Sequence, residues 1–84
     1  MQYMVTTVRG HATKYRLFES YDKAVIYHDR QVDDMYFTNQ LRNIEIDTIR
    51  TYGGRIVSTN IIEWLEDDTL KAIGYVKITE MEEE

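Results

Sequence analysis

Acidic side chains gather near the carboxyl end of the chain, where Glu63 is followed by Glu66, Asp67 and Asp68. Carboxylate oxygens are the ligands that divalent cations such as Ca²⁺ prefer. The stretch lacks the alternating Asp/Asn residues and the glycine of a calcium-binding loop. We therefore interpret it as a solvated acidic turn, and we predict no metal site.

Two histidines, His11 and His28, are the only other residues typical of catalytic or zinc sites, because the chain has no cysteine. Zinc or a catalytic base would need further ligands or partners at defined spacing, and no such pattern is present. His28 lies on the apolar face of a predicted helix, so we expect it to be packed and hydrogen-bonded. Gly53-Gly54 lacks the wider glycine spacing and the following Lys-Ser/Thr of a phosphate-binding loop. We predict no enzymatic activity, no catalytic residue and no cofactor.

Basic and aromatic residues alternate in the amino-terminal part of the chain, a mixture that can hold phosphates and stack unpaired bases. These candidate nucleic-acid-binding residues are Arg9, His11, Lys14, Tyr15 and Arg16. The formal net charge of −5 argues against general nucleic-acid binding, since phosphate contacts supply most of the non-specific affinity. RNA binding is therefore an alternative, and the expected partner is a protein, most simply a basic one. A second alternative is that acids along the helix and in the carboxyl-terminal part mimic nucleic-acid charge.

The chain is 84 residues long, which indicates one domain that buries roughly 60–65% of the surface its unfolded form exposes. We place this domain at residues 1–79 and an acidic tail at 80–84. Neither a basic segment followed by an apolar core nor an apolar run of about 20 residues is present. The sequence therefore predicts a cytoplasmic protein that does not cross a membrane.

Periodicity and turn residues predict an α+β domain with an antiparallel sheet of about five strands and one helix on one face, in the order β-β-α-β-β-β. Ser20 is a suitable N-cap for the helix. A second helix ending at Gly53 is the alternative after Phe37, but the β-branched residues around Gly53-Gly54 favour a hairpin. The predicted elements are strands 2–9 and 12–18, a helix 21–36, and strands 44–52, 55–65 and 69–79.

Two-residue loops at Gly53-Gly54 and Asp67-Asp68 would set the register of the last three strands and place one set of side chains under the helix. This predicted core consists of Ile44, Ile46, Val57, Ile61, Leu65, Leu70, Val76 and Ile78. The same register makes the opposite face apolar as well, with Ile49, Ile56, Ile62, Trp64, Ile73 and Tyr75.

A second apolar face calls for a covering partner. Three occupants remain open at this point: the N-terminal hairpin of the same chain in a curled sheet, a second copy in a homodimer, or a different protein. The predicted protein-binding residues are Ile56, Ile62, Trp64, Ile73 and Tyr75, with Glu66, Asp67 and Asp68 as an acidic edge. In being short, acidic, cysteine-free and rich in tyrosine and isoleucine, the chain resembles the small inhibitors that bacteriophages make against host enzymes or defence systems. That resemblance implies a non-enzymatic inhibitor of a host or defence protein. We predict a protein-binding module that forms a homodimer.

Overall fold

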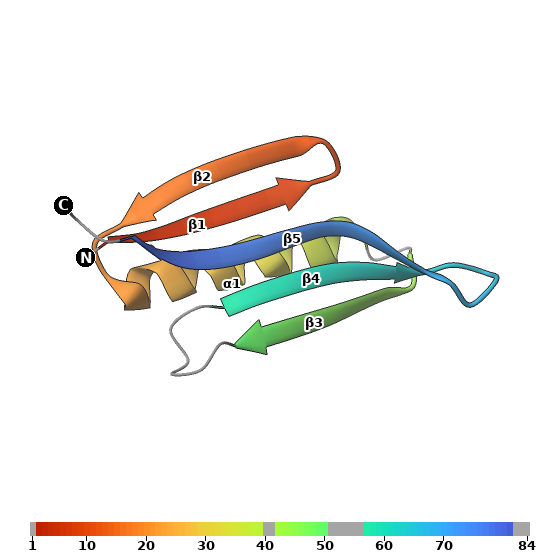
Figure 1. The fold of residues 1–84 in the computed structure, drawn as a ribbon. Coiled ribbons are helices and arrows are strands. Elements are labelled where there is room, and N and C mark those ends of the chain that lie inside the picture. The colour runs from red at the N-terminus through yellow and green to blue at the C-terminus, as the bar shows by residue number, and fades with distance from the viewer. Residues whose placement is uncertain (1, 40–41, 51–56, 82–84) are drawn as a thin grey trace.

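The computed structural model describes residues 2–39, 42–50 and 57–81. Within these ranges the fold is the predicted α+β arrangement, with one helix packed against a five-stranded antiparallel sheet (Figure 1). The elements are β1 (Gln2–Arg9), β2 (Ala12–Phe18), α1 (Tyr21–Thr38), β3 (Ile44–Arg50), β4 (Val57–Trp64) and β5 (Leu70–Met81). The segment after α1 forms strand β3 over residues 44–50, which confirms the strand prediction for that part.

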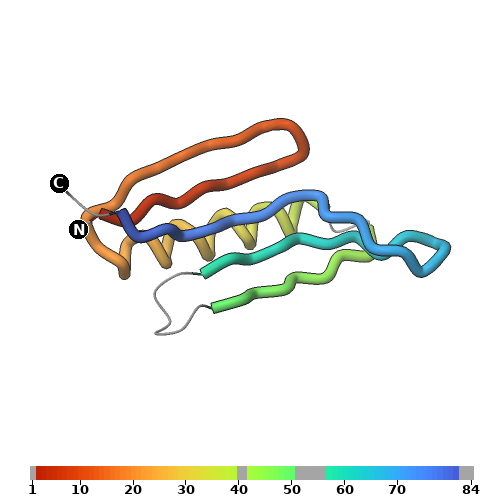
Figure 2. The backbone as a smooth tube through the Cα atoms, in the orientation of Figure 1, coloured from red at the N-terminus to blue at the C-terminus, as the bar shows by residue number. Residues whose placement is uncertain are grey.

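The strand order in the sheet is β2-β1-β5-β4-β3, so the first and last strands of the chain are neighbours. The β1–β2 hairpin extends the sheet edge to edge through the antiparallel β1–β5 pair, and α1 lies on one side of the sheet only (Figures 1 and 2). The hairpin turn includes Gly10, which has a φ of 57° that favours glycine. The alternative of a curled sheet, in which this hairpin would fold over the opposite face, is therefore excluded.

Helix α1 begins where the sequence indicates. The Ser20 side chain accepts a hydrogen bond from the Lys23 backbone N–H (3.5 Å), which satisfies one of the free donors of the first turn. The helix ends at Thr38, two residues later than predicted. Its buried side chains recur at spacings of three and four, as an amphipathic helix requires: Ala24, His28, Val32 and Met35.

The core lies between α1 and the middle of the sheet. Val57, Ile61, Val76 and Ile78 are buried as predicted, and Ile44 is half-buried. The other three predicted core residues, Ile46, Leu65 and Leu70, are exposed. Ile46 is exposed because α1 packs mainly across β1 and β5 and leaves β3 at the far edge. Leu65 and Leu70 lie at the β4–β5 loop, which differs from the predicted turn. β1 supplies the remaining core side chains of the sheet, Tyr3 and Val5.

The register of β3 with β4, from Ile44–Glu63 to Arg50–Val57, is the predicted one, although Gly53-Gly54 lies outside the described residues.

The predicted β4–β5 register is correct at Ile61–Gly74 and differs by one residue near the turn, where Trp64 pairs with Leu70. The turn differs from the prediction. Asp68 N–H donates to Leu65 C=O (3.0 Å) and Leu65 N–H to Thr69 C=O (2.9 Å), and Asp68 has a φ of 62°. This is a three-residue loop.

A register shift between Ile61 and Ile62 offsets the extra loop residue and leaves Ile73 without a partner on β4. Three predicted positions change as a result. Ile62 faces Ala72 instead of Ile73, Trp64 faces Leu70 instead of Lys71, and Lys71 pairs with Glu63. Ile73 is half-buried and packs against the core, so its predicted place on the opposite face is wrong.

Strand β5 continues through Glu80 and Met81, which pair with Tyr3 and Gln2 of β1. The first two residues of the predicted tail are thus part of the sheet, and 82–84 lie outside the described residues. Over the parts of the chain that are described, no helix is both long and apolar enough to cross a membrane.

Candidate functional site: the uncovered face of the sheet

The side of the sheet opposite α1, here called the outer face, has no second layer over it within the described structure (Figure 1). Strand alternation and the observed pairs place alternate residues of all five strands there. The apolar and aromatic ones are Met4, Val8, Tyr15, Leu17, Ile49, Ile62, Trp64, Leu70, Ala72, Tyr75 and Met81.

Three of these side chains gather where β4 ends and β5 begins. We call this group the Trp64 cluster: Ile62, Trp64 and Leu70. Trp64 is 39% exposed, Leu70 is 54% exposed, and Ile62 is half-buried. Ile49 lies opposite Ser58 toward the other end of β3 and is not part of this group. Leu70 joins the cluster because of the longer loop, so the surface beside Trp64 is more apolar than the predicted one, which had Lys71 there.

The indole of Trp64 is anchored across the sheet. Its Nε1–H donates to Glu45 Oε2 on β3 (3.1 Å), and Glu45 is the strand partner of Ile62. This hydrogen bond satisfies the polar edge of the ring and leaves its apolar surface accessible. An aromatic ring held in this way loses little conformational entropy when a partner packs against it.

Carboxylates border the Trp64 cluster. Glu45 and Asp47 lie on the outer face of β3, and Glu66, Asp67 and Asp68 are exposed in the loop between Trp64 and Leu70. The Asp67 carboxylate accepts hydrogen bonds from the Thr69 hydroxyl (2.5 Å) and the Thr69 backbone N–H (3.2 Å). These bonds favour the ionised form and lower the pKa of Asp67 below its ordinary value. The loop therefore keeps its negative charge at neutral pH.

The predicted protein-binding residues are brought together only in part. Ile62, Trp64 and Tyr75 share the outer face, whereas Ile73 turns toward the core and Ile56 lies outside the described residues. The acidic loop residues adjoin Trp64 as predicted. Leu70 was missed, because placing it requires the loop length that the sequence pattern did not reveal.

The predicted nucleic-acid-binding residues do not form one surface. Tyr15 is exposed on the outer face, while Lys14 and Arg16 pair with Thr7 and Val5, whose side chains face α1. The Arg16 guanidinium lies over the rings of Phe18 (5.3 Å) and Tyr27 (5.0 Å), a cation–π arrangement within the fold. The remaining two residues, Arg9 and His11, lie at the tip of the hairpin.

One buried polar chain has the residue types of a catalytic triad. His28 Nδ1 lies 2.9 Å from Asp29 Oδ1, and Nε2 lies 2.8 Å from Thr59 Oγ1. Thr59 is fully buried, so no substrate in solvent reaches its hydroxyl. The arrangement matches the expectation that His28 is packed and hydrogen-bonded. Elsewhere in residues 2–39, 42–50 and 57–81, no group of three acidic or histidine side chains is placed to hold a metal ion.

No protein-family model matches this chain, and neither the curated proteins nor the solved structures that were compared with it gave a match.

Proposed function

We propose that this protein is a non-enzymatic protein-binding domain that docks through the Trp64 cluster. The observation that supports this proposal is an apolar group on a sheet face with no second layer in the described structure. Exposed clusters around a tryptophan are typical of binding hot spots, in which a few large side chains supply most of the affinity. The hydrogen bond to Glu45 adds preorganisation to the central ring.

The proposed occupant is a basic protein with an apolar patch bordered by Arg or Lys. Glu45, Asp47 and the loop acids Glu66, Asp67 and Asp68 would face those cations, and a net charge of −5 would speed the encounter. A second copy is the weaker candidate, since two copies of the same face bring two acidic borders together. In the finer form of the proposal, the domain is an inhibitor that covers a functional surface of its partner.

The test is site-specific photo-crosslinking in cells that produce the protein. A photoreactive amino acid replaces Leu70 in the cluster or, as a matched control, Ile26, which is about equally exposed but lies on α1. We expect adducts with a basic protein from position 70, loss of those adducts in Trp64→Ala, and none of them from position 26. Their yield should also fall in Asp67→Asn/Asp68→Asn.

Two results would contradict the proposal. Adducts only between copies of this chain would replace the basic partner with a homodimer. Equal adducts from positions 70 and 26 would show that the Trp64 cluster has no special role. Circular dichroism on each variant would establish that a lost adduct does not reflect unfolding.

A further inference from the structure

A cavity of about 680 Å³ lies at the end of the β1–β2 hairpin, beside residues 71–75 of β5. Strand β1 pairs with β5 only from Gly74 onward, so residues 70–73 of β5 extend past its end. The cavity occupies this step, between the hairpin tip, β4, β5 and the C-terminal end of α1. Its size is in the range of about 300–1,000 Å³ that small-molecule sites have.

The lining is basic although the protein as a whole is acidic. Arg9, His11, Arg42 and Lys71 all line the cavity, and no carboxylate is found among the described residues of the lining. Tyr75 adds an aromatic ring, and Asn60 adds an amide. Cationic and amide N–H donors around an aromatic side chain are suited to a ligand that carries both a phosphate and a flat ring.

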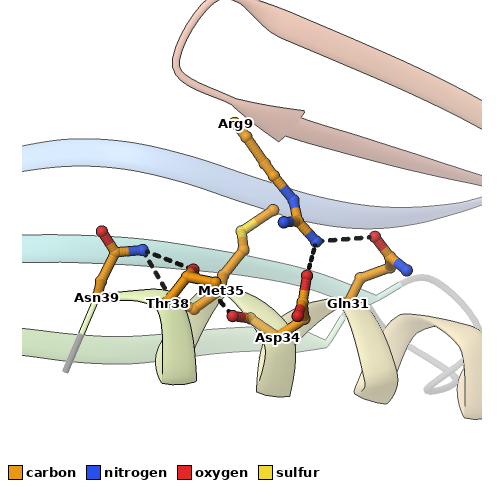
Figure 3. Close-up of polar contacts among 6 residues, drawn as sticks. All are labelled: Arg9, Gln31, Asp34, Met35, Thr38 and Asn39. Carbon is orange, nitrogen blue, oxygen red and sulfur yellow. Dashed lines mark hydrogen bonds and ion pairs between the residues drawn. The ribbon is translucent and has the colours of Figure 1, made fainter.

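The two arginines keep hydrogen-bonding capacity for a ligand. Arg9 uses Nη2 for Asp34 (2.5 Å) and Gln31 (3.3 Å), as Figure 3 shows, and Arg42 uses Nε for Glu63 (3.5 Å). A guanidinium has five N–H donors, so each arginine is positioned by its carboxylate and retains free donors. Lys71 makes no ion pair with any described residue, although Glu63 is its strand partner, so its ammonium group can bind a ligand.

The end of α1 would ordinarily oppose anion binding, because the last carbonyl groups of a helix carry partial negative charge. Here those groups are occupied. Thr38 Oγ1 donates to the carbonyl oxygens of Asp34 (2.9 Å) and Met35 (3.1 Å), and Asn39 Nδ2 donates to Met35 (2.7 Å), as Figure 3 shows. The Asn39 backbone N–H binds the Tyr36 carbonyl (3.2 Å). These bonds reduce the negative potential on the α1 side of the cavity.

The backbone around the cavity is fixed by two close approaches. Gly10 N–H donates to Ile73 C=O (3.1 Å), which ties the hairpin tip to the bulged residue of β5. At Gly74, an added Cβ would lie 2.5 Å from the Val8 carbonyl oxygen, so only glycine permits this approach of β1. The basic side chains are thus presented from a rigid frame.

We propose that this cavity binds a phosphorylated nucleotide, with the phosphate near Lys71, Arg42 and His11 and the base against Tyr75. The phosphate could come from a free mononucleotide or from the 5′ end of a single-stranded RNA, and both sources share this chemistry. Tyr75 also belongs to the outer face, but nucleotide binding does not depend on the protein-binding proposal.

The test is a ¹⁵N NMR titration of the whole protein with AMP, with adenosine and with inorganic phosphate. We expect AMP to shift the amide signals of residues 10–11 and 71–74 and to bind more tightly than adenosine. Lys71→Glu should weaken AMP binding by about tenfold or more, the effect of losing one charge-assisted hydrogen bond. The matched control is Lys77→Glu on the same strand, which changes charge equally outside the cavity lining and should alter the affinity by less than about twofold.

A 5′-phosphorylated RNA oligonucleotide compared with its 5′-hydroxyl form distinguishes the two sources. Tighter binding of the phosphorylated RNA than of AMP assigns the site to an RNA end, and equal or weaker binding assigns it to the free nucleotide. No shift with AMP or the phosphorylated RNA at millimolar concentration overturns the proposal. Equal weakening by Lys71→Glu and Lys77→Glu also overturns it, because the effect would then be one of overall charge.

Discussion

His28 Nε2 lies 2.8 Å from Thr59 Oγ1, and this hydrogen bond joins the helix to the middle strand of the β3–β4–β5 meander inside the core. With the ring proton on Nδ1, His28 donates to Asp29 and accepts from the Thr59 hydroxyl. Thr59 Oγ1 in turn lies 3.1 Å from Thr48 Oγ1 on β3. A continuous polar chain therefore crosses from the exposed side of α1 to the edge strand, with both buried members satisfied.

Thr59→Val should lower the free energy of unfolding by about 1–3 kcal/mol, because it leaves the buried His28 Nε2 without a partner while preserving side-chain shape. Urea denaturation followed by circular dichroism measures the effect. Thr13→Val, on exposed β2, is the matched control and should be close to neutral. In the double variant Thr59→Val/His28→Leu, the loss of unfolding free energy should be smaller than the sum of the losses in the two single variants. Additive costs would mean that the bond contributes nothing specific.

Gly74→Ala should destabilise the protein by about 1–3 kcal/mol, since the new Cβ would lie 2.5 Å from the Val8 carbonyl oxygen and 3.3 Å from Met35 Sδ. The strain falls on the β1–β5 pair, so amide exchange should accelerate in β1. Gly10→Asn is the comparison variant. Gly10 has a positive φ and open space around it, and asparagine tolerates this backbone conformation. Gly10→Asn should lower the free energy of unfolding by less than Gly74→Ala does, and the opposite result would contradict the close approach of β1 and β5.

Glu45→Ala should increase the quenching of Trp64 fluorescence by acrylamide, because the indole loses the hydrogen bond that holds it against β3. Trp64 is the only tryptophan in the chain, so the signal reports this position alone. The stability change should stay below about 1.5 kcal/mol for an exposed bond. Asp47→Ala removes a neighbouring carboxylate of the same strand and should leave quenching unchanged. If both variants behave alike, the Trp64–Glu45 contact does not position the ring.

Thr69→Val should raise the pKa of Asp67 toward its ordinary value of 3.8, since the Thr69 hydroxyl is the main cause of the lowering. A pKa lowered on folding adds stability above the unfolded-state value, and that stability is lost as the pH falls through the folded-state value. The contribution is therefore present at neutral pH and disappears below about pH 4. Carboxyl NMR titration of the wild type and the variant checks this. An Asp67 pKa that is identical in both would rule out the hydroxyl as the cause.

Much of the fold could be predicted because its signals are local. Ser20 marks the start of α1, a period of three to four residues defines its buried face, and Gly10 marks the first hairpin. Each of these patterns is determined within a few residues by capping, side-chain direction and backbone sterics. The β3–β4 register follows from the alternation of apolar residues in the same way.

The tertiary structure decided which side chains share a surface. The pairing of β1 with β5 joins residues some 70 positions apart, and it alone determines which strands α1 covers. The β4–β5 loop has one extra residue, and the bulge at Ile73 restores the register beyond it. The alternation of apolar and polar residues on either side of these two points therefore looks regular in the sequence. Between those two points, Leu70 and Ile73 exchange faces. Leu70 is placed by the loop length, and the bulge at Ile73 adjoins Gly74, whose close approach to Val8 is made only when distant strands meet.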